Sequence, residues 1–128
     1  MKHRILIVDR DRETLRRCEE ILGPLGYETK TMTGPIDSVI TAMETERPDL
    51  VLMDIHVPDS DTDLEAAGSI GRRHGLPLIY LVGKADAETV EKSRGTDPYG
   101  YVLKPVSEHH LVSNIDSAMR RLQLERGL

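Results

Sequence analysis

The chain has 128 residues, which suits one domain that can bury enough surface to fold without a metal or disulfide staple. It contains a single cysteine, Cys18, so an internal disulfide is excluded. The net charge is −5, the basic residues are dispersed among acids, and neither Phe nor Trp is present, which argues against direct binding of nucleic acid. No stretch has the length and apolar character of a signal peptide or membrane span, so we expect a cytoplasmic protein that does not contact a membrane.

The first half of the chain alternates short apolar runs with longer amphipathic stretches. Residues 4–8 predict a buried strand, and residues 12–23 predict a helix with one apolar side. Residues 27–32 predict a weaker strand. Residues 35–46 predict a second helix, because Pro35 stands where a first helical residue is expected and apolar residues follow at helical spacing.

The second half repeats this alternation three times. Strands are predicted at 50–55, 76–82 and 99–103. Helices are predicted at 63–73, 86–94 and 107–125. Asp86 and Ser107 are suited to cap the last two helices. Continuous apolar runs are typical of parallel strands covered on both faces, so the pattern predicts an α/β, doubly wound (βα)5 fold with a five-stranded parallel sheet.

Polar side chains stand where three of these strands end. Asp9 follows the first strand, Asp54 ends the third, and Lys104 follows the fifth. Ligands of open α/β sheets lie beyond the carboxyl ends of the strands, so we expect these three residues to converge on one edge. Each alone is more simply explained as a helix cap or a solvated residue. Together they suit phosphoryl transfer, with Asp54 as the nucleophile, Asp9 holding a metal or its water, and Lys104 pairing with the phosphoryl group.

Four segments carry a resemblance to a known family. They are "ILIVDRDRE" (5–13), "PDLVLMDIHVPDSD" (48–61), "LPLIYLVGKAD" (76–86) and "YGYVLKPVSEHHL" (99–111). The chain resembles the receiver domains of response regulators in two-component signalling, which include the chemotaxis regulators. Its Pro-Tyr-Gly-Tyr segment before Lys-Pro is similar to receiver modules attached to sensor histidine kinases. The resemblance implies a flavodoxin-like three-layer sandwich with strand order 2-1-3-4-5, a receiver domain over 1–124, and the end of the last helix or a linker over 125–128.

The resemblance also implies roles for individual residues in phosphoryl transfer. Asp54 is expected to accept a phosphoryl group from a histidine kinase, and Lys104 to contact that group. Asp9, Asp54 and the backbone carbonyl of His56 are expected to hold Mg²⁺, whereas the imidazole of His56 is expected at the surface. No enzymatic activity is expected beyond self-phosphorylation and autodephosphorylation at Asp54.

Three further positions correspond to those that, in the family, form a switch that responds to phosphorylation. These positions are Val82, Gly83 and Tyr101. The backbone N–H of Gly83 is expected to remain able to reach an anion. The resemblance also implies a cis peptide bond before Pro105, which would orient the lysine.

Two positions depart from the family pattern. Arg10 stands where the family has a second acid that binds magnesium directly, and a guanidinium can neither bind a cation nor lose its proton. Val82 stands where the family has Ser or Thr, so the hydroxyl that contacts the phosphoryl group is missing. We therefore expect weak or absent Mg²⁺ binding and impaired switching.

Three interpretations of Arg10 are open, besides a surface arginine without a role. In the favoured one, Arg10 lies in the site as a built-in cation paired with Asp9 and Asp54. In the second, Arg10 turns to solvent and Asp11 gives up a helix cap to become a substitute magnesium ligand. In the third, the acid was lost because the domain only needs to bind a partner.

The leading functional hypothesis is a receiver domain of a phosphorelay, with a histidine kinase or phosphotransfer protein as its partner. The alternative is a pseudo-receiver that is not phosphorylated and acts as an interaction or dimerisation module. A homodimer would use the fourth helix, fifth strand and fifth helix, and an output or kinase domain could follow residue 124. A flavin-binding or other small-molecule domain ranks below both, because no glycine-rich phosphate loop is present.

Overall fold

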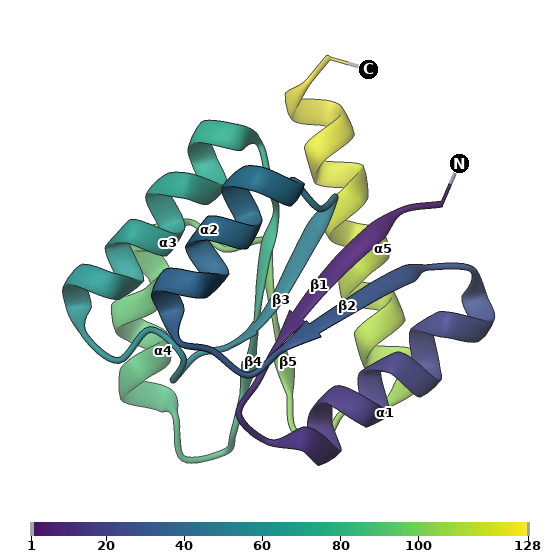
Figure 1. Ribbon diagram of the computed structural model, residues 1–128, viewed down its shortest axis with the longest axis horizontal. Coiled ribbons are helices and arrows are strands. Elements are labelled where there is room, and N and C mark those ends of the chain that lie inside the picture. Colours follow the sequence, from purple (N-terminus) through teal and green to yellow (C-terminus); the bar gives the residue numbers. More distant parts are fainter. Residues whose placement is uncertain (1, 128) are drawn as a thin grey trace.

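The computed structural model describes residues 2–127, which form one parallel sheet with helices on both faces (Figure 1). The strands are β1 (Arg4–Val8), β2 (Glu28–Met32), β3 (Leu50–Asp54), β4 (Leu78–Val82) and β5 (Gly100–Leu103). The helices are α1 (Arg12–Leu22), α2 (Ile36–Glu46), α3 (Asp61–His74), α4 (Ala87–Ser93) and α5 (Glu108–Glu125). Short 3-10 turns follow α1 at Gly23–Leu25 and α4 at Arg94–Thr96.

The strands lie in the order β2-β1-β3-β4-β5, and every neighbouring pair is parallel. This confirms the predicted fold class and strand order. Two elements start two residues away from their predicted positions: β4 begins at Leu78 rather than residue 76, and α3 begins at Asp61 rather than residue 63. The side chain of Ser60 accepts a hydrogen bond from the Asp63 backbone N–H, so this serine caps the helix earlier than the apolar pattern indicates.

The core has two apolar layers, one on each face of the sheet. One layer packs α2 and α3 against the sheet, and the other packs α1 and α5 against the opposite face. Every residue of β3 and β4 is buried, which explains why their sequences are continuous apolar runs. Because both central strands are held on two sides, their carboxyl ends are fixed in position.

The end of the last helix is attached to the segment that leads into β5. Arg121 forms an ion pair with Asp97 at 3.0 Å, and its guanidinium lies 4.1 Å from the centre of the Tyr99 ring. The helix ends at Glu125, the first residue of the segment 125–128, and Leu128 lies outside the described residues.

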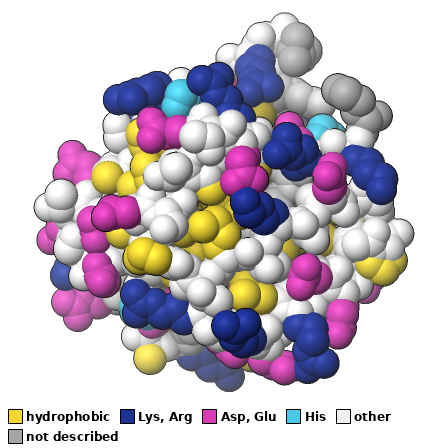
Figure 2. Space-filling model, viewed as in Figure 1, with side chains coloured by type: hydrophobic (Ala, Val, Ile, Leu, Met, Phe, Trp, Pro, Cys, Tyr) yellow, Lys and Arg dark blue, Asp and Glu magenta, His cyan; other side chains and the backbone are white. Residues whose placement is uncertain are grey.

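The charged side chains are mixed in sign on the face that Figure 2 presents, where basic and acidic groups alternate around apolar patches. Over residues 2–127, no helix combines the length and apolar character needed to cross a bilayer.

Candidate functional site

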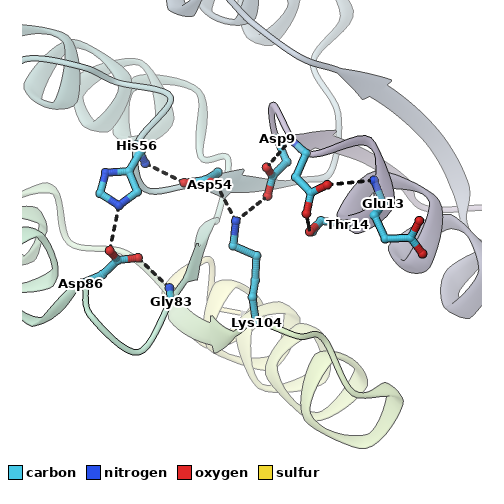
Figure 3. A network of polar contacts seen from close by, with 9 residues as sticks. Asp9, Glu13, Thr14, Asp54, His56, Gly83, Asp86 and Lys104 are labelled. Atoms are coloured by element: carbon cyan, nitrogen blue, oxygen red, sulfur yellow. Dashed lines mark hydrogen bonds and ion pairs between the residues drawn. The ribbon is translucent and has the colours of Figure 1, made fainter.

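Three side chains from separate strands meet at the carboxyl edge of the sheet. Lys104 Nζ lies 3.0 Å from Asp9 Oδ2 and 2.6 Å from Asp54 Oδ2 (Figure 3). Asp9 follows β1, Asp54 is the last residue of β3, and Lys104 follows β5. The structure therefore brings together the residues that the strand pattern predicted to converge.

The electrostatics of this group follow from its burial. Asp9 is 1 % exposed, and burial raises the pKa of its carboxyl even though the Asp11 N–H and Lys104 act in the opposite direction. Burial also acts to lower the pKa of Lys104, but its hydrogen bonds to Asp54 and Asp9 outweigh this, so that pKa is raised. An ammonium that stays charged is thus held between two carboxyl groups.

Backbone donors fix the other oxygen of each carboxylate. The Asp11 N–H donates to Asp9 Oδ1 at 2.9 Å, and the His56 N–H donates to Asp54 Oδ1 at 2.8 Å. Each carboxylate therefore has one backbone donor and shares the lysine. Groups held in this way need little rearrangement before they react.

The favoured interpretation of Arg10 is wrong for this structure. Arg10 is exposed, and within residues 2–127 it forms no ion pair. The cation between Asp9 and Asp54 is Lys104. Asp11 caps α1, accepting hydrogen bonds from the Glu13 N–H at 3.1 Å and the Thr14 hydroxyl at 2.9 Å. The arginine therefore turns to solvent, as in the second interpretation, but Asp11 keeps its place as a cap.

A second polar group adjoins the first and was missed by the sequence reasoning. His56 Nε2 lies 2.8 Å from Asp86 Oδ1, and the Gly83 backbone N–H donates to Asp86 Oδ2 at 2.6 Å (Figure 3). Asp86 stands at the N-cap of α4, as predicted, but its side chain makes no capping bond. The hydrogen bonds from Gly83 and His56 lower the pKa of Asp86. The only signal in the sequence was the three-residue spacing of Gly83 and Asp86, which is typical of a side chain that bonds a nearby backbone N–H.

This geometry agrees with comparisons with known proteins. Residues 5–116 match the family model of the response regulator receiver domain. The chain belongs to this family. Among solved structures, the receiver domain of a modulated diguanylate cyclase from Desulfovibrio desulfuricans G20 has a TM-score of 0.85 and 26% identity, with 98% of this chain and 99% of that one covered. A CheY-like receiver domain protein from Methanospirillum hungatei JF-1 has a TM-score of 0.82 and 28% identity over 98% and 99%.

The curated relatives are longer than this chain. The transcriptional regulatory protein PdtaR of Mycobacterium tuberculosis is 28% identical, and the match covers 94% of this chain and 58% of PdtaR. The DNA-binding response regulator MtrA of Mycolicibacterium smegmatis is 29% identical, with coverage of 94% and 52%. This receiver domain therefore spans little more than half the length of either relative.

Two positions that correspond to the switch of the family, Val82 and Tyr101, lie on β4 and β5. Val82 is buried among apolar side chains and offers no hydrogen-bond donor from its side chain. Tyr101 is half-buried, its hydroxyl lies 2.6 Å from Ser93 Oγ, and its ring centre lies 6.0 Å from that of Tyr80. The Lys104–Pro105 peptide bond is cis, as the resemblance implied, and Gly34–Pro35 is cis as well.

Receiver domains generally bind Mg²⁺ for phosphorylation, and this ion is held by oxygen ligands. Two buried carboxylates, Asp9 and Asp54, stand side by side at Lys104 and fit an ion that keeps most of its waters. Among residues 2–127, however, no cluster of three or more His, Cys, Asp or Glu side chains is arranged to hold a metal.

Proposed function

We propose that this receiver domain accepts a phosphoryl group on Asp54 from the phosphohistidine of a histidine kinase or phosphotransfer protein. Family membership supports the general role, since receiver domains interact with such partners. The observation that carries the specific proposal is the 2.6 Å contact between Asp54 Oδ2 and Lys104 Nζ at the carboxyl edge of the sheet. It pairs a candidate nucleophile with a cation suited to stabilise a phosphoryl group.

The transfer uses groups that are already in place. An oxygen of the Asp54 carboxylate attacks phosphorus, the P–N bond to the donor histidine breaks, and the electron pair stays on the imidazole nitrogen. The Lys104 ammonium and the His56 backbone N–H, which both contact Asp54 here, offset charge on the transferring oxygens. Acetyl phosphate reacts in the same way, with cleavage of its P–O bond and departure of acetate.

We further propose that magnesium binding and switching are weakened in this chain. Asp9, Asp54 and the His56 carbonyl would hold Mg²⁺, which when bound supplies positive charge next to the transferring phosphoryl oxygens. The missing acid at position 10 supports weak binding, because Arg10 is exposed and contributes a positive charge in place of a ligand. The apolar side chain of Val82 supports weak switching, because it cannot bond a phosphoryl oxygen.

The test is to incubate the chain with acetyl phosphate or phosphoramidate, with and without Mg²⁺, and to measure intact mass. The expected result is a mass gain of one phosphoryl group that Asp54→Asn abolishes. Asp61→Asn serves as the matched control, because Asp61 is exposed in the first turn of α3 and makes no contact with Lys104. An Asp54→Asn variant that gains the same mass as the wild type would contradict the proposal.

A second candidate function is a pseudo-receiver that binds a partner or a second copy of itself without being phosphorylated. The departures at Arg10 and Val82 favour it, and Leu103 on β5 is 40 % exposed on the face where we predict dimerisation through α4, β5 and α5. Absence of mass gain under every condition, together with a dimer by light scattering that Leu103→Lys disrupts, would favour this candidate. An output or kinase domain after residue 124 remains a prediction.

A further inference from the structure

The side chain of Asp86 is turned away from the helix that it precedes. An aspartate at an N-cap normally bonds the first backbone N–H groups of its own helix. Asp86 instead accepts the Gly83 N–H at 2.6 Å, and its side chain is only 15 % exposed. Its carboxylate is therefore directed at the loop after β4, on the edge of the sheet that carries Asp54.

Gly83 is placed to serve an anion on Asp54. In the sheet register, Asp54 on β3 stands opposite Leu81 on β4, so Gly83 lies two residues beyond it at the same edge. A backbone N–H at such an edge is a natural donor to a bound anion. In this structure that donor is already bonded, because the Asp86 carboxylate occupies it.

His56 holds Asp86 in this place and connects it to the phosphoacceptor. Its Nε2 atom lies 2.8 Å from Asp86 Oδ1, while its backbone N–H donates to Asp54 Oδ1. Figure 3 shows the resulting chain from Asp54 through His56 and Asp86 to Gly83. The positive charge of Lys104 also reaches Asp86, where it contributes to the lowered pKa after the stronger effects of Gly83 and His56.

The glycine itself permits the close approach of the carboxylate. A Cβ atom at position 83 would lie 3.3 Å from Asp86 Oδ2, which is tighter than an ordinary van der Waals contact. With no side chain at this position, the carboxylate reaches the N–H without obstruction.

We propose that the Asp86 carboxylate, held by His56, is an internal competitor that occupies the Gly83 N–H and so weakens the binding of a phosphoryl group at Asp54. This inference rests on the proposed function of Asp54. It makes Asp86 a residue that sets how readily the site accepts an anion, although Asp86 is not itself a nucleophile or an expected metal ligand.

The test is a titration of the chain with beryllofluoride at constant Mg²⁺, followed by NMR of the backbone amides. Asp86→Ala is expected to bind the probe about tenfold more tightly, because one charge-assisted hydrogen bond no longer competes. The Gly83 amide signal is expected to move further on binding in Asp86→Ala than in wild type. Because Asp86 makes no capping bond, this substitution leaves the start of α4 intact, which amide spectra of the free protein will verify.

Two further variants separate this mechanism from a general effect of charge. Glu88→Ala removes the same charge from the first turn of α4, where Glu88 is exposed, and is expected to change affinity by less than about twofold. His56→Ala keeps the Asp86 charge but removes its support, and is expected to give a gain smaller than that of Asp86→Ala. Equal affinity in wild type and Asp86→Ala would overturn the proposal, as would an equal gain in Glu88→Ala or a loss of affinity in His56→Ala.

The outcome also distinguishes failure of this inference from failure of the proposed function. If every variant, including Asp86→Ala, neither binds beryllofluoride nor gains a phosphoryl group from acetyl phosphate, then Asp54 is not a phosphoacceptor and the competitor role falls with it. If wild type and Asp86→Ala bind and react equally, Asp54 keeps its role and only the competition is refuted.

Discussion

At the scale of single residues, the site depends on which cation reaches the two buried carboxylates. Arg10 is adjacent to Asp9 in sequence, yet it is exposed. Lys104 is 95 residues away from Asp9 in the chain and bridges both acids. The strand end directs Asp9 inward, and the next residue faces the opposite way, so adjacency in sequence works against Arg10.

Replacing Arg10 by an acid tests how much this arginine weakens Mg²⁺ binding. We predict that Arg10→Asp tightens Mg²⁺ binding by at least about tenfold, since it adds a carboxylate and removes a like charge, effects each worth on the order of 1 kcal/mol. Isothermal titration with MgCl₂ measures this. Arg12→Asp is the control, because it makes the same change of charge at an exposed position on α1 and adds no ligand. Equal gains in both variants would mean that only net charge matters.

At the scale of elements, the approach of α3 to the turn after α4 depends on a missing side chain. A Cβ atom at Gly68 would lie 2.7 Å from Thr96 Cβ. Thr96 cannot easily move, because its hydroxyl bonds the Ser93 carbonyl at 2.6 Å and lies 3.0 Å from the Tyr80 hydroxyl. Gly68, which lies inside this helix, is therefore required by packing.

We predict that Gly68→Ala lowers the free energy of unfolding by about 1–2 kcal/mol, because an overpacking cost of up to about 3 kcal/mol outweighs a gain in helix propensity of roughly 1 kcal/mol. Urea unfolding followed by circular dichroism measures the change. Ser69→Ala, one residue further along α3, reports propensity without the clash. A Gly68→Ala variant more stable than wild type would show that α3 or the turn shifts freely.

Strands and helices could be predicted from the sequence, whereas the orientation of individual side chains could not. Continuous apolar runs suit burial on both faces of a sheet, so the inner strands and the edge where Asp9, Asp54 and Lys104 meet were predictable. The direction in which a flexible side chain points was not predictable. Asp86 could cap α4 or reach back to Gly83, and both choices satisfy its carboxylate. Only the position of His56, which comes from another loop, selects between them.

At the scale of the whole molecule, the two apolar layers shield the side chains on both faces of the sheet from solvent. Cys18 lies in the layer formed by α1 and α5 and is completely buried. Burial, and next the charge of Asp9, raise the pKa of its thiol from 9.0 to about 12. The reactive thiolate is therefore suppressed as long as the domain is folded.

Labelling of the Cys18 thiol can measure global unfolding, because Cys18 is the one cysteine in the sequence. We predict that near neutral pH the native protein resists a disulfide reagent that labels the urea-unfolded protein fully. Rapid labelling of the native protein would show that α1 opens independently of the sheet.

The raised pKa of the Cys18 thiol also makes stability depend on pH. It favours the folded state below pH 9.0, and this contribution is lost as the pH rises towards about 12. Cys18→Ala is therefore expected to lose less stability than wild type over that range.

The direction of α5 has a practical consequence for anyone who attaches something to this protein. The helix starts near the carboxyl edge of the sheet, where Asp54 and Lys104 lie, and runs for 18 residues, about 27 Å, back along the sheet to the side where β1 begins (Figure 1). A fluorescent label attached just before β1 or just after α5 would therefore lie at the opposite edge of the sheet from Asp54 and leave the strand ends around that residue accessible.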